Sequence, residues 1–357
     1  MQLKVGVAGL CSDHLWPVWG KGILRETMES EMYQMVAAAD KNAPLLDRIR
    51  KEYGVKNTYF SYEEMLKKED LDVVIVGTPN SEKADVVEIA AERGIHVLID
   101  KPMSANLEQA ERIVSAAKRY NIKGLVYYPG FFDPKSLEIH RLIKEGVLGE
   151  IFQIEGRVSN PGPELHGCSK YFLEWLFDKE KNGGGALIDY GCYTALYCRW
   201  FLGQPLGVMG IGGRFVKDII EAEDNAVLLL RYPKAISIIQ ASWSEYAADT
   251  AWKHYPGPKL AVYGSEGAVI WHHWNDETLS LITKEHPEGT TIKPSTLPEE
   301  MKNPPTYLAN CIINDKPVDE PLNLELCRDV QEILEAGYRS LKLKREVELP
   351  IQPAKGE

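Results

Sequence analysis

The sequence lacks an excess of basic residues, a long apolar run, paired cysteines and any internal repeat. Lysine and arginine number 41 against 52 acidic residues, and the net charge of −11 argues against nucleic acid or an anionic membrane surface as a partner. No run approaches the roughly 20 apolar residues that a membrane span needs. Residues 1–7 are too short and glycine-interrupted for a signal peptide. We therefore expect a cytoplasmic protein.

Cysteine and histidine give no sign of a metal centre. The two adjacent histidines, His272 and His273, would point to opposite faces of a strand, and no other ligands cluster with them. We predict no metal site. Without a secretory signal and without a CxxC pair, the cysteines are predicted to be free thiols. The six are Cys11, Cys168, Cys192, Cys198, Cys311 and Cys327.

The first 150 residues alternate between strand and helix patterns. This alternation is typical of βαβ units around a parallel sheet. The expected strands are 4–8, 35–39, 71–76, 96–99 and 123–127, and the expected helices are 44–53, 84–93 and 107–120. The fold class predicted for this part is an α/β domain of the Rossmann type.

The pattern changes after residue 149 to strands separated by turns, with few helices. These strands predict one mostly antiparallel open sheet: 151–159, 207–215, 226–232, 235–244, 259–263, 268–271 and 279–283. Helical spacing returns at 186–202 and at 324–343. At 357 residues the chain is long enough for two domains. We expect domains at 1–125 and 126–322, with 323–357 packing back on the body.

One expected strand, 96–99, runs directly into an acid, a lysine and a proline. Pro102 restricts the residue before it to an extended conformation, so Lys101 is expected at the carboxyl end of the strand. Ligands of open α/β sheets bind at that edge. Taken alone, Lys101 is either a solvated loop lysine or a residue that faces a ligand.

The turn after the first strand fits the GxGxxG fingerprint poorly. Its three glycine positions hold Gly9, Cys11 and His14, so a pyrophosphate would meet only one of the usual glycines. Asp40 ends the second strand and is either an ordinary turn residue or an acceptor for an adenosine ribose. Its carboxylate would repel a 2′-phosphate and so favour NAD over NADP, although Lys41 could offset the repulsion.

In the expected helix 186–202, Asp189 and Tyr193 are four residues apart and share one face. As an isolated pair they are either a buried hydrogen-bonded pair or catalytic groups. Three glycines, 183–185, precede this helix.

The motifs together resemble the Gfo/Idh/MocA oxidoreductase family over nearly the whole chain. Residues 99–104 are similar to its Glu-Lys-Pro stretch, with Asp100 in place of the glutamate, and residues 183–193 are similar to its second motif. Most members carry histidine where this chain has Tyr193. The motif with tyrosine at this position resembles that of the branch containing glucose–fructose oxidoreductase and the dimeric dihydrodiol dehydrogenases.

The resemblance implies a cofactor site for NAD, with NADP less favoured. Residues 78–80 resemble the loop on the nicotinamide side, although Lys83 replaces the usual histidine. The cofactor-binding residues are then predicted to be Gly9, Cys11, His14, Asp40, Lys41, Thr78, Pro79, Asn80, Asp100 and Lys101. The insertion 15–30 carries Trp16 and Trp19, which either line a pocket or pack locally.

The catalytic residues implied by the resemblance are Lys101, Asp189 and Tyr193. A substrate alcohol needs a base within hydrogen-bond reach, and a tyrosine has an unperturbed pKa of about 10. The Lys101 ammonium would lower the pKa of Tyr193 and stabilise alkoxide character, while Asp189 orients the hydroxyl or Lys101. Alternatively, a neutral Lys101 is itself the base.

The family implies sugars, polyols or glycosides as substrates and a homo-oligomer, dimer or tetramer, formed through the second sheet. Besides the three catalytic residues, the substrate contacts are predicted among Tyr128, His166, Lys170, Tyr171, Trp175, Trp243 and Tyr246. Two other functions stay open. One is a glycosidase that retains NAD, and the other is a non-catalytic, nucleotide-bound sensor.

Overall fold

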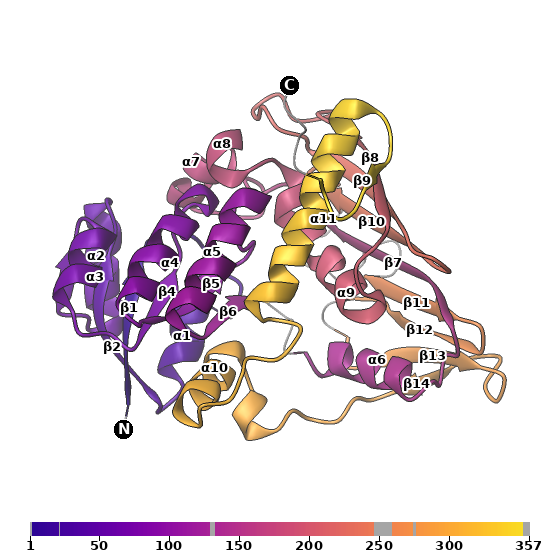
Figure 1. Ribbon diagram of the computed structural model, residues 1–357, viewed down its shortest axis with the longest axis horizontal. Coiled ribbons are helices and arrows are strands. Elements are labelled where there is room, and N and C mark those ends of the chain that lie inside the picture. Colours follow the sequence, from indigo (N-terminus) through magenta and orange to yellow (C-terminus); the bar gives the residue numbers. More distant parts are fainter. Residues whose placement is uncertain (1, 21, 129–132, 246–258, 274–275, 353–357) are drawn as a thin grey trace. The chain divides into compact units, whose positions relative to one another are not determined.

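The computed structural model describes residues 2–20, 22–128, 133–245, 259–273 and 276–352 (Figure 1). The chain divides into two compact units, each built from three segments of the sequence. Unit 1 comprises Met1–Pro129, Cys168–Gly183 and Pro298–Arg328, and unit 2 comprises Gly130–Gly167, Gly184–Leu297 and Asp329–Glu357.

Unit 1 is built on a six-stranded parallel sheet in the order β3-β2-β1-β4-β5-β6. Its strands are β1 (Leu3–Ala8), β2 (Tyr33–Ala39), β3 (Asn57–Tyr59), β4 (Val73–Val76), β5 (His96–Asp100) and β6 (Gly124–Tyr127). The strand order reverses between β1 and β4. Ligands of open α/β sheets bind outside the carboxyl ends of the strands at such a point.

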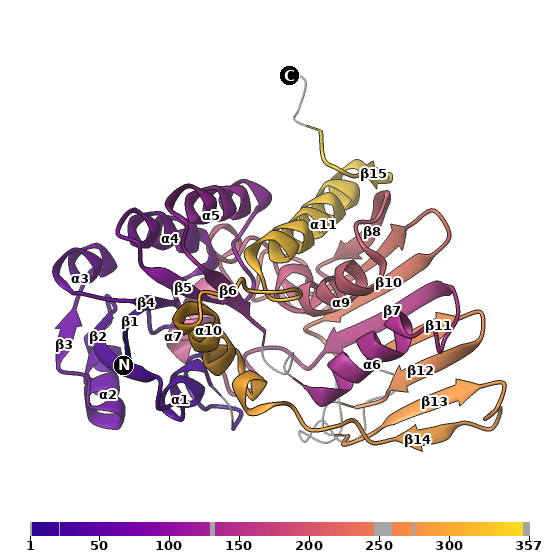
Figure 2. The same cartoon turned by 60° about the horizontal axis from the view of Figure 1, so that its bottom comes forward.

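Helices cover both faces of this sheet. Figure 2 shows α4 and α5 on one face and α1 and α10 on the other. All four residues of β4 are buried, as expected for a parallel strand covered on both sides. The helices are α1 (Ile23–Met28), α2 (Ala43–Tyr53), α3 (Tyr62–Lys68), α4 (Lys83–Glu92), α5 (Leu107–Tyr120), α7 (Lys170–Leu176), α8 (Lys179–Asn182) and α10 (Pro304–Ile313).

Unit 2 contains a nine-stranded sheet in the order β14-β13-β12-β11-β7-β10-β9-β8-β15. Every pairing is antiparallel except that of β7 with β10. The strands are β7 (Ile151–Ser159), β8 (Gly207–Gly213), β9 (Asn225–Arg231), β10 (Ile236–Ser242), β11 (Leu260–Gly264), β12 (Gly267–Trp271), β13 (Leu279–Thr283), β14 (Thr290–Ile292) and β15 (Val347–Glu348).

One face of this second sheet is covered by helices, and no helix in the described parts of the chain covers the other face. The covering helices are α6 (Pro134–Lys144), α9 (Cys192–Leu202) and the part of α11 (Leu324–Leu343) that belongs to unit 2. Along β9, Leu228 and Leu230 are buried, whereas Val227 and Leu229 between them are 40% and 47% exposed. The alternation gives the sheet an uncovered face with exposed apolar side chains.

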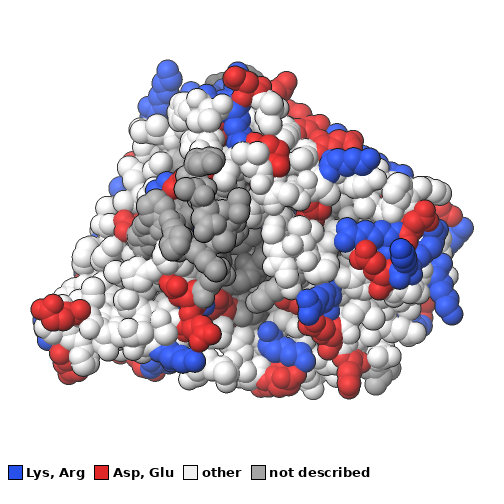
Figure 3. All heavy atoms as spheres, turned by 180° about the vertical axis from the view of Figure 1, so that it is seen from behind, with Lys and Arg blue, Asp and Glu red and all other residues white. Residues whose placement is uncertain are grey.

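The predicted fold class is confirmed, since a Rossmann-type parallel sheet accompanies a mostly antiparallel sheet. The expectation of few helices after residue 149 was wrong for α7, α8 and α10, and α6 was missed as well. No helix in the described ranges is long and apolar enough to cross a membrane. Figure 3 shows acidic and basic side chains interspersed on one face of the molecule.

Candidate functional site

The loops after β1 and β4 touch at the point where the strand order of unit 1 reverses. Gly9 has φ +83°, and a Cβ on it would lie 2.5 Å from the backbone nitrogen of Thr78. Its own N–H donates to the carbonyl oxygen of Ala39 at 2.8 Å. Both the close approach and the left-handed backbone require glycine here.

The loop after Gly9 departs from the glycine-rich fingerprint in structure as well as in sequence. No helix begins directly after it, because α1 starts only at Ile23. Cys11 is buried, with Sγ 3.8 Å from the carbonyl oxygen of Gly77, and burial raises the pKa of its thiol. Trp16 is buried by local packing, since Nε1 donates to the carbonyl oxygen of Leu10 at 2.9 Å.

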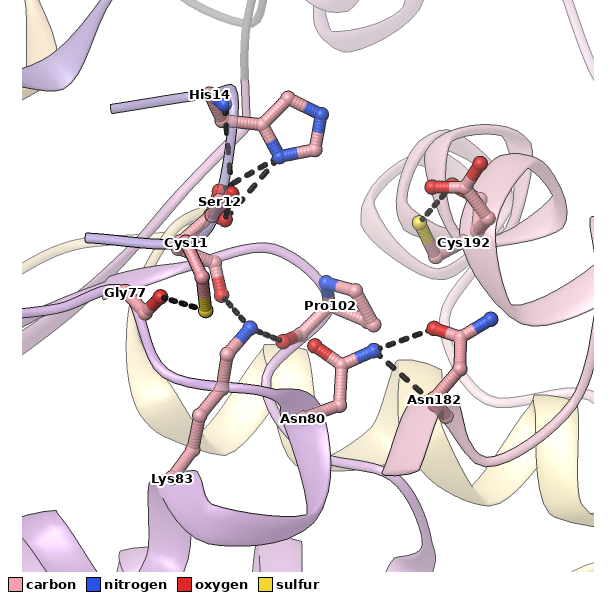
Figure 4. Close-up of polar contacts among 11 residues, drawn as sticks. Cys11, Ser12, His14, Gly77, Asn80, Lys83, Pro102, Asn182 and Cys192 are labelled. Atoms are coloured by element: carbon pink, nitrogen blue, oxygen red, sulfur yellow. Dashed lines mark hydrogen bonds and ion pairs between the residues drawn. The ribbon is translucent and has the colours of Figure 1, made fainter. Parts of the chain in front are cut away.

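Two side chains of this loop, those of Ser12 and His14, converge on Asp100 at the end of β5. Figure 4 labels both of them. The Ser12 hydroxyl donates to Oδ2 at 2.6 Å, and Nδ1 of His14 lies 3.0 Å from Oδ1. Burial opposes ionisation of Asp100, but His14, Lys83 and Ser12 hold its pKa below the ordinary value. The fully buried carboxylate is therefore stabilised by partners that are distant in the sequence.

Lys101 follows Asp100 and is 1% exposed. Its N–H donates to the carbonyl oxygen of Tyr127 at 3.2 Å, and its peptide bond to Pro102 is cis. The side chain of Lys83 donates to the carbonyl oxygens of Asp100 and Pro102 (Figure 4). The backbone of Lys101 is thus anchored at the carboxyl edge of the sheet.

The loop after β4 presents polar atoms that nothing in the described part of the chain satisfies. Thr78 Oγ1 and Asn80 Oδ1 are buried and have no hydrogen-bond partner there. Nδ2 of Asn80 is held by Asn182, with Oδ1 at 2.8 Å and the carbonyl oxygen at 3.0 Å. Buried polar atoms without partners are costly, so this loop fits a polar ligand such as a nicotinamide carboxamide.

Asp40, at the end of β2, uses its carboxylate to shape two turns. Oδ2 accepts from the N–H of Leu10 at 2.7 Å, and Oδ1 accepts from the N–H of Asn42 at 2.7 Å. The next residue, Lys41, is exposed. Asp40 therefore places a negative charge beside the loop after β1, where the adenosine ribose of a dinucleotide would bind.

In unit 2, the segment before α9 is a π-helical turn, Leu187–Gly191, that carries Asp189. Oε1 of Glu223 accepts from the N–H groups of Gly185 and Leu187 at 2.9 and 3.0 Å, and from the Tyr338 hydroxyl at 2.8 Å. A Cβ on Gly184 would lie 1.9 Å from that hydroxyl oxygen. π-Helical turns are rare and are frequently found at functional sites.

Asp189 is 4% exposed, and its Oδ2 accepts from Nε1 of Trp243 at 3.0 Å. Tyr193 is partly exposed near the start of α9. Burial lowers the pKa of His166, while the charge of Asp189 opposes that shift. Asp189 and His166 are therefore electrostatically linked within unit 2, whereas Lys101 belongs to unit 1.

The other predicted substrate contacts differ in exposure. Tyr128 is buried, Tyr171 is partly buried, and Lys170 is exposed with Nζ 5.0 Å from the Tyr171 ring centroid. Trp243 holds Asp189, and Tyr246 lies outside the described residues. Within those described, no group of three or more His, Cys, Asp or Glu side chains could hold a metal ion.

Sequence reasoning missed several residues that shape the site. Lys83 was visible only as a departure from the family histidine, and Asn182 only as the residue before three glycines. Glu223 and Tyr338 gave no signal, because their partners are distant in sequence.

Residues 3–128 match the model of an oxidoreductase family with an NAD-binding Rossmann fold, and residues 136–270 match the Gfo/Idh/MocA C-terminal domain. A D-xylose 1-dehydrogenase [NADP(+)] from Haloarcula marismortui is 27% identical over 87% of this chain and 83% of its own. Trans-1,2-dihydrobenzene-1,2-diol dehydrogenase from Xenopus laevis is 29% identical, over about half of each chain, 48% and 49%. The crystal structure of aldose-aldose oxidoreductase from Caulobacter crescentus, complexed with glycerol, superposes with a TM-score of 0.81 at 21% identity, covering 98% of this chain and 100% of that one.

The fold and these matches define the protein as an oxidoreductase with an NAD-binding Rossmann domain. The chain belongs to the Gfo/Idh/MocA family, because consecutive models of that family match most of its length.

Proposed function

We propose that the protein transfers a hydride between NAD and a secondary alcohol of a sugar, polyol or glycoside. The observation that carries this proposal is the buried Lys101, anchored at the carboxyl edge of the sheet in the same unit as the unsatisfied polar atoms of Thr78 and Asn80. A cation at that edge can stabilise negative charge that develops on a substrate oxygen.

The cofactor would be held by the edge of unit 1. The loop Gly9–His14 faces the pyrophosphate, Asp40 accepts from the adenosine ribose with Lys41 beside it, and residues 78–80 bind the nicotinamide side. Asp100 and Lys101 complete this set from β5. NAD, when bound, supplies the hydride acceptor or donor.

In our assignment Tyr193 removes the proton from the substrate hydroxyl and returns it in the reverse direction. Lys101 favours the phenolate of Tyr193 and stabilises the developing alkoxide. Asp189, held by Trp243, orients the substrate hydroxyl or Lys101. A neutral Lys101 acting directly as the base is the alternative mechanism.

The substrate class rests on the polar groups and on the relatives. Lys101, Asp189 and Tyr193, together with Tyr128, His166, Lys170 and Tyr171, provide the donors and aromatic rings that recognise several hydroxyls. Two of the relatives are named as dehydrogenases of a sugar and of a cyclic diol. We infer that adjacent hydroxyl groups on a ring are the recognised feature.

For the cofactor we infer a preference for NAD over NADP. The carboxylate of Asp40 is fixed by two backbone N–H groups and would repel a 2′-phosphate. The exposed Lys41 would attract a 2′-phosphate and so offset this repulsion. One relative is named as an NADP(+) enzyme. A Kd for NADP below that for NAD would contradict this inference.

We also propose a homo-oligomer, dimer or tetramer, formed through the uncovered face of the second sheet. The face exposes apolar side chains of three strands, namely Ile211 of β8, Val227 and Leu229 of β9, and Ile236 of β10. Sedimentation velocity would detect the oligomer, and Leu229→Lys should dissociate it. The six cysteines are free thiols, which suits a reducing compartment, so we also propose a cytoplasmic location. The net charge of −11 disfavours nucleic acid and anionic membrane surfaces as partners.

The experiment that tests the function is a titration with NAD and NADP, followed by a screen of sugars, polyols and glycosides that follows NADH absorbance. We expect binding of NAD and steady NADH formation with at least one ring polyol. Tight binding with substrate cleavage but no net NADH would instead indicate a glycosidase that retains its cofactor. Binding without any turnover would indicate a sensor, and no binding of either dinucleotide would contradict the proposal.

A further inference from the structure

Lys83 is a fully buried lysine at the first position of α4. Its Nζ donates to the carbonyl oxygen of Asp100 at 2.5 Å and to that of Pro102 at 2.8 Å. These two carbonyls belong to the residues on either side of Lys101. Lys83 therefore bridges the backbone on the two sides of Lys101, and Figure 4 shows its contact with Pro102.

The position of Lys83 contradicts the local rule for helix starts. The first turn of a helix favours acidic side chains, because its free N–H groups carry partial positive charge. Lysine is almost never fully buried unless it is paired. A buried ammonium at this position therefore needs compensation from elsewhere in the fold.

This compensation comes from the carboxyl end of β5, directly before Lys101. Two carbonyl dipoles accept from Nζ, and the charge of Lys83 is among the factors that lower the pKa of the buried Asp100. Ser12 and His14 bind the same carboxylate from the loop after β1. The structure thus places a buried cation and a buried anion around one short backbone segment.

We propose that Lys83 is a positioning residue for Lys101, and that it acts by holding the carbonyl groups of Asp100 and Pro102. The inference rests on the proposed function only for the catalytic consequence, because the restraint on the backbone exists without substrate. The ammonium offers three donors, so it can fix both carbonyls at once. Charge-assisted hydrogen bonds are roughly twice as strong as neutral ones, which suits a rigid support.

The first test measures hydrogen exchange of the peptide that spans residues 99–104, in protein without ligand. Lys83→Met keeps an unbranched apolar side chain that is one heavy atom shorter and removes all donors, and we expect exchange in this peptide to be about tenfold faster. Lys67→Met changes an exposed lysine of α3 and serves as the matched control, with unchanged exchange. Unchanged exchange in Lys83→Met would overturn the proposal.

A second variant keeps the test decisive if Lys83→Met does not fold. Lys83→Gln retains an NH2 donor without the charge, and we expect exchange between that of the wild type and the tenfold increase. Exchange equal to that of the wild type in Lys83→Gln would show that the ammonium is not needed and would overturn the proposal.

The catalytic consequence is tested by a double-mutant cycle on kcat and KM. Lys83→Met should lower kcat by about ten- to a hundredfold with little change in the Kd of NAD, and it should have no further effect on a Lys101→Met enzyme. An equal loss in both backgrounds would show that Lys83 does not act through Lys101. A wild-type enzyme without dehydrogenase activity would contradict the proposed function, while the exchange result would still decide the positioning role.

Discussion

Two segments of unit 1 meet at the carboxyl edge of its sheet, and they differ in how they resemble the family. Residues 100–102 keep the acid-lysine-proline pattern, whereas the loop Gly9–His14 has lost two of three fingerprint glycines. Yet Ser12 and His14 of the altered loop bind Asp100 of the preserved segment. Side-chain contacts therefore connect this loop to the segment that carries Lys101, although the glycine pattern is absent.

The largest effect is expected in the preserved segment. In the proposed mechanism Lys101 stabilises the developing alkoxide, so we expect Lys101→Met to lower kcat by about a thousandfold. The Kd of NAD should change by less than about fivefold, because the loops after β1, β2 and β4 are intact. Steady-state kinetics and a fluorescence titration measure the two quantities. A loss in affinity as large as the loss in kcat would show that Lys101 mainly binds the cofactor.

The contact between the two segments is broken by Asp100→Asn. Removing a buried charge that Ser12, His14 and Lys83 stabilise should lower the free energy of unfolding by about 2–4 kcal/mol at pH 7, measured by urea denaturation. Because the pKa of Asp100 is lowered in the folded state, its contribution is present above about pH 4, the unfolded value, and is lost as pH falls through the folded value. The difference between the wild type and Asp100→Asn should therefore shrink below about pH 4. A difference that grows on acidification would contradict this account.

A smaller effect is expected from the altered loop. His14→Gln keeps a polar side chain but loses the ring that contacts Asp100, Trp19 and Phe172. We expect the free energy of unfolding to fall by about 1 kcal/mol and the Kd of NAD to rise severalfold. Calorimetric titration gives the affinity. Unchanged affinity and stability together would show that the loop does not depend on this contact.

The smallest effect is expected from restoring a fingerprint glycine. Cys11→Gly removes a buried thiol whose Sγ lies 3.8 Å from the carbonyl oxygen of Gly77, and the loop is held elsewhere by Ser12, His14 and Gly9. The Kd of NAD should change by less than about threefold. A large gain in affinity would mean that the missing glycine weakens dinucleotide binding. It would contradict the view that side-chain contacts hold the loop in place of the glycine pattern.

The regular elements could be predicted from sequence because their signals are local. Helix 324–343 agrees with α11 at both ends, and strand 151–159 agrees with β7. Lys101 could be placed because Pro102 and the preceding apolar run fix the end of β5. The helices α6 and α10 were missed although each has proline in its first turn, which is a start signal as well as a break signal.

The supporting contacts of the site could not be predicted. Ser12 bonds to Asp100 across 88 residues, and Glu223 bonds to Leu187 and Gly185 across 36 and 38. Such pairs depend on tertiary packing and leave no periodic pattern in the sequence. The π-helical turn that carries Asp189 has no composition that distinguishes it from an α-helix. The sequence therefore indicated the residues that we propose to react, but it did not indicate the residues that hold them in place.

The central claim is that Tyr193 moves the proton while Lys101 supports it electrostatically. The most direct measurement is the rate of hydride transfer in a single turnover, followed by NADH absorbance, for the wild type, Tyr193→Phe and Lys101→Met across pH. We predict that Tyr193→Phe loses at least about a hundredfold in rate and also loses the rise of rate with pH that ionisation of the base produces in the wild type. A Tyr193→Phe enzyme that keeps nearly the full rate and the wild-type profile would contradict the claim and would identify Lys101 as the base.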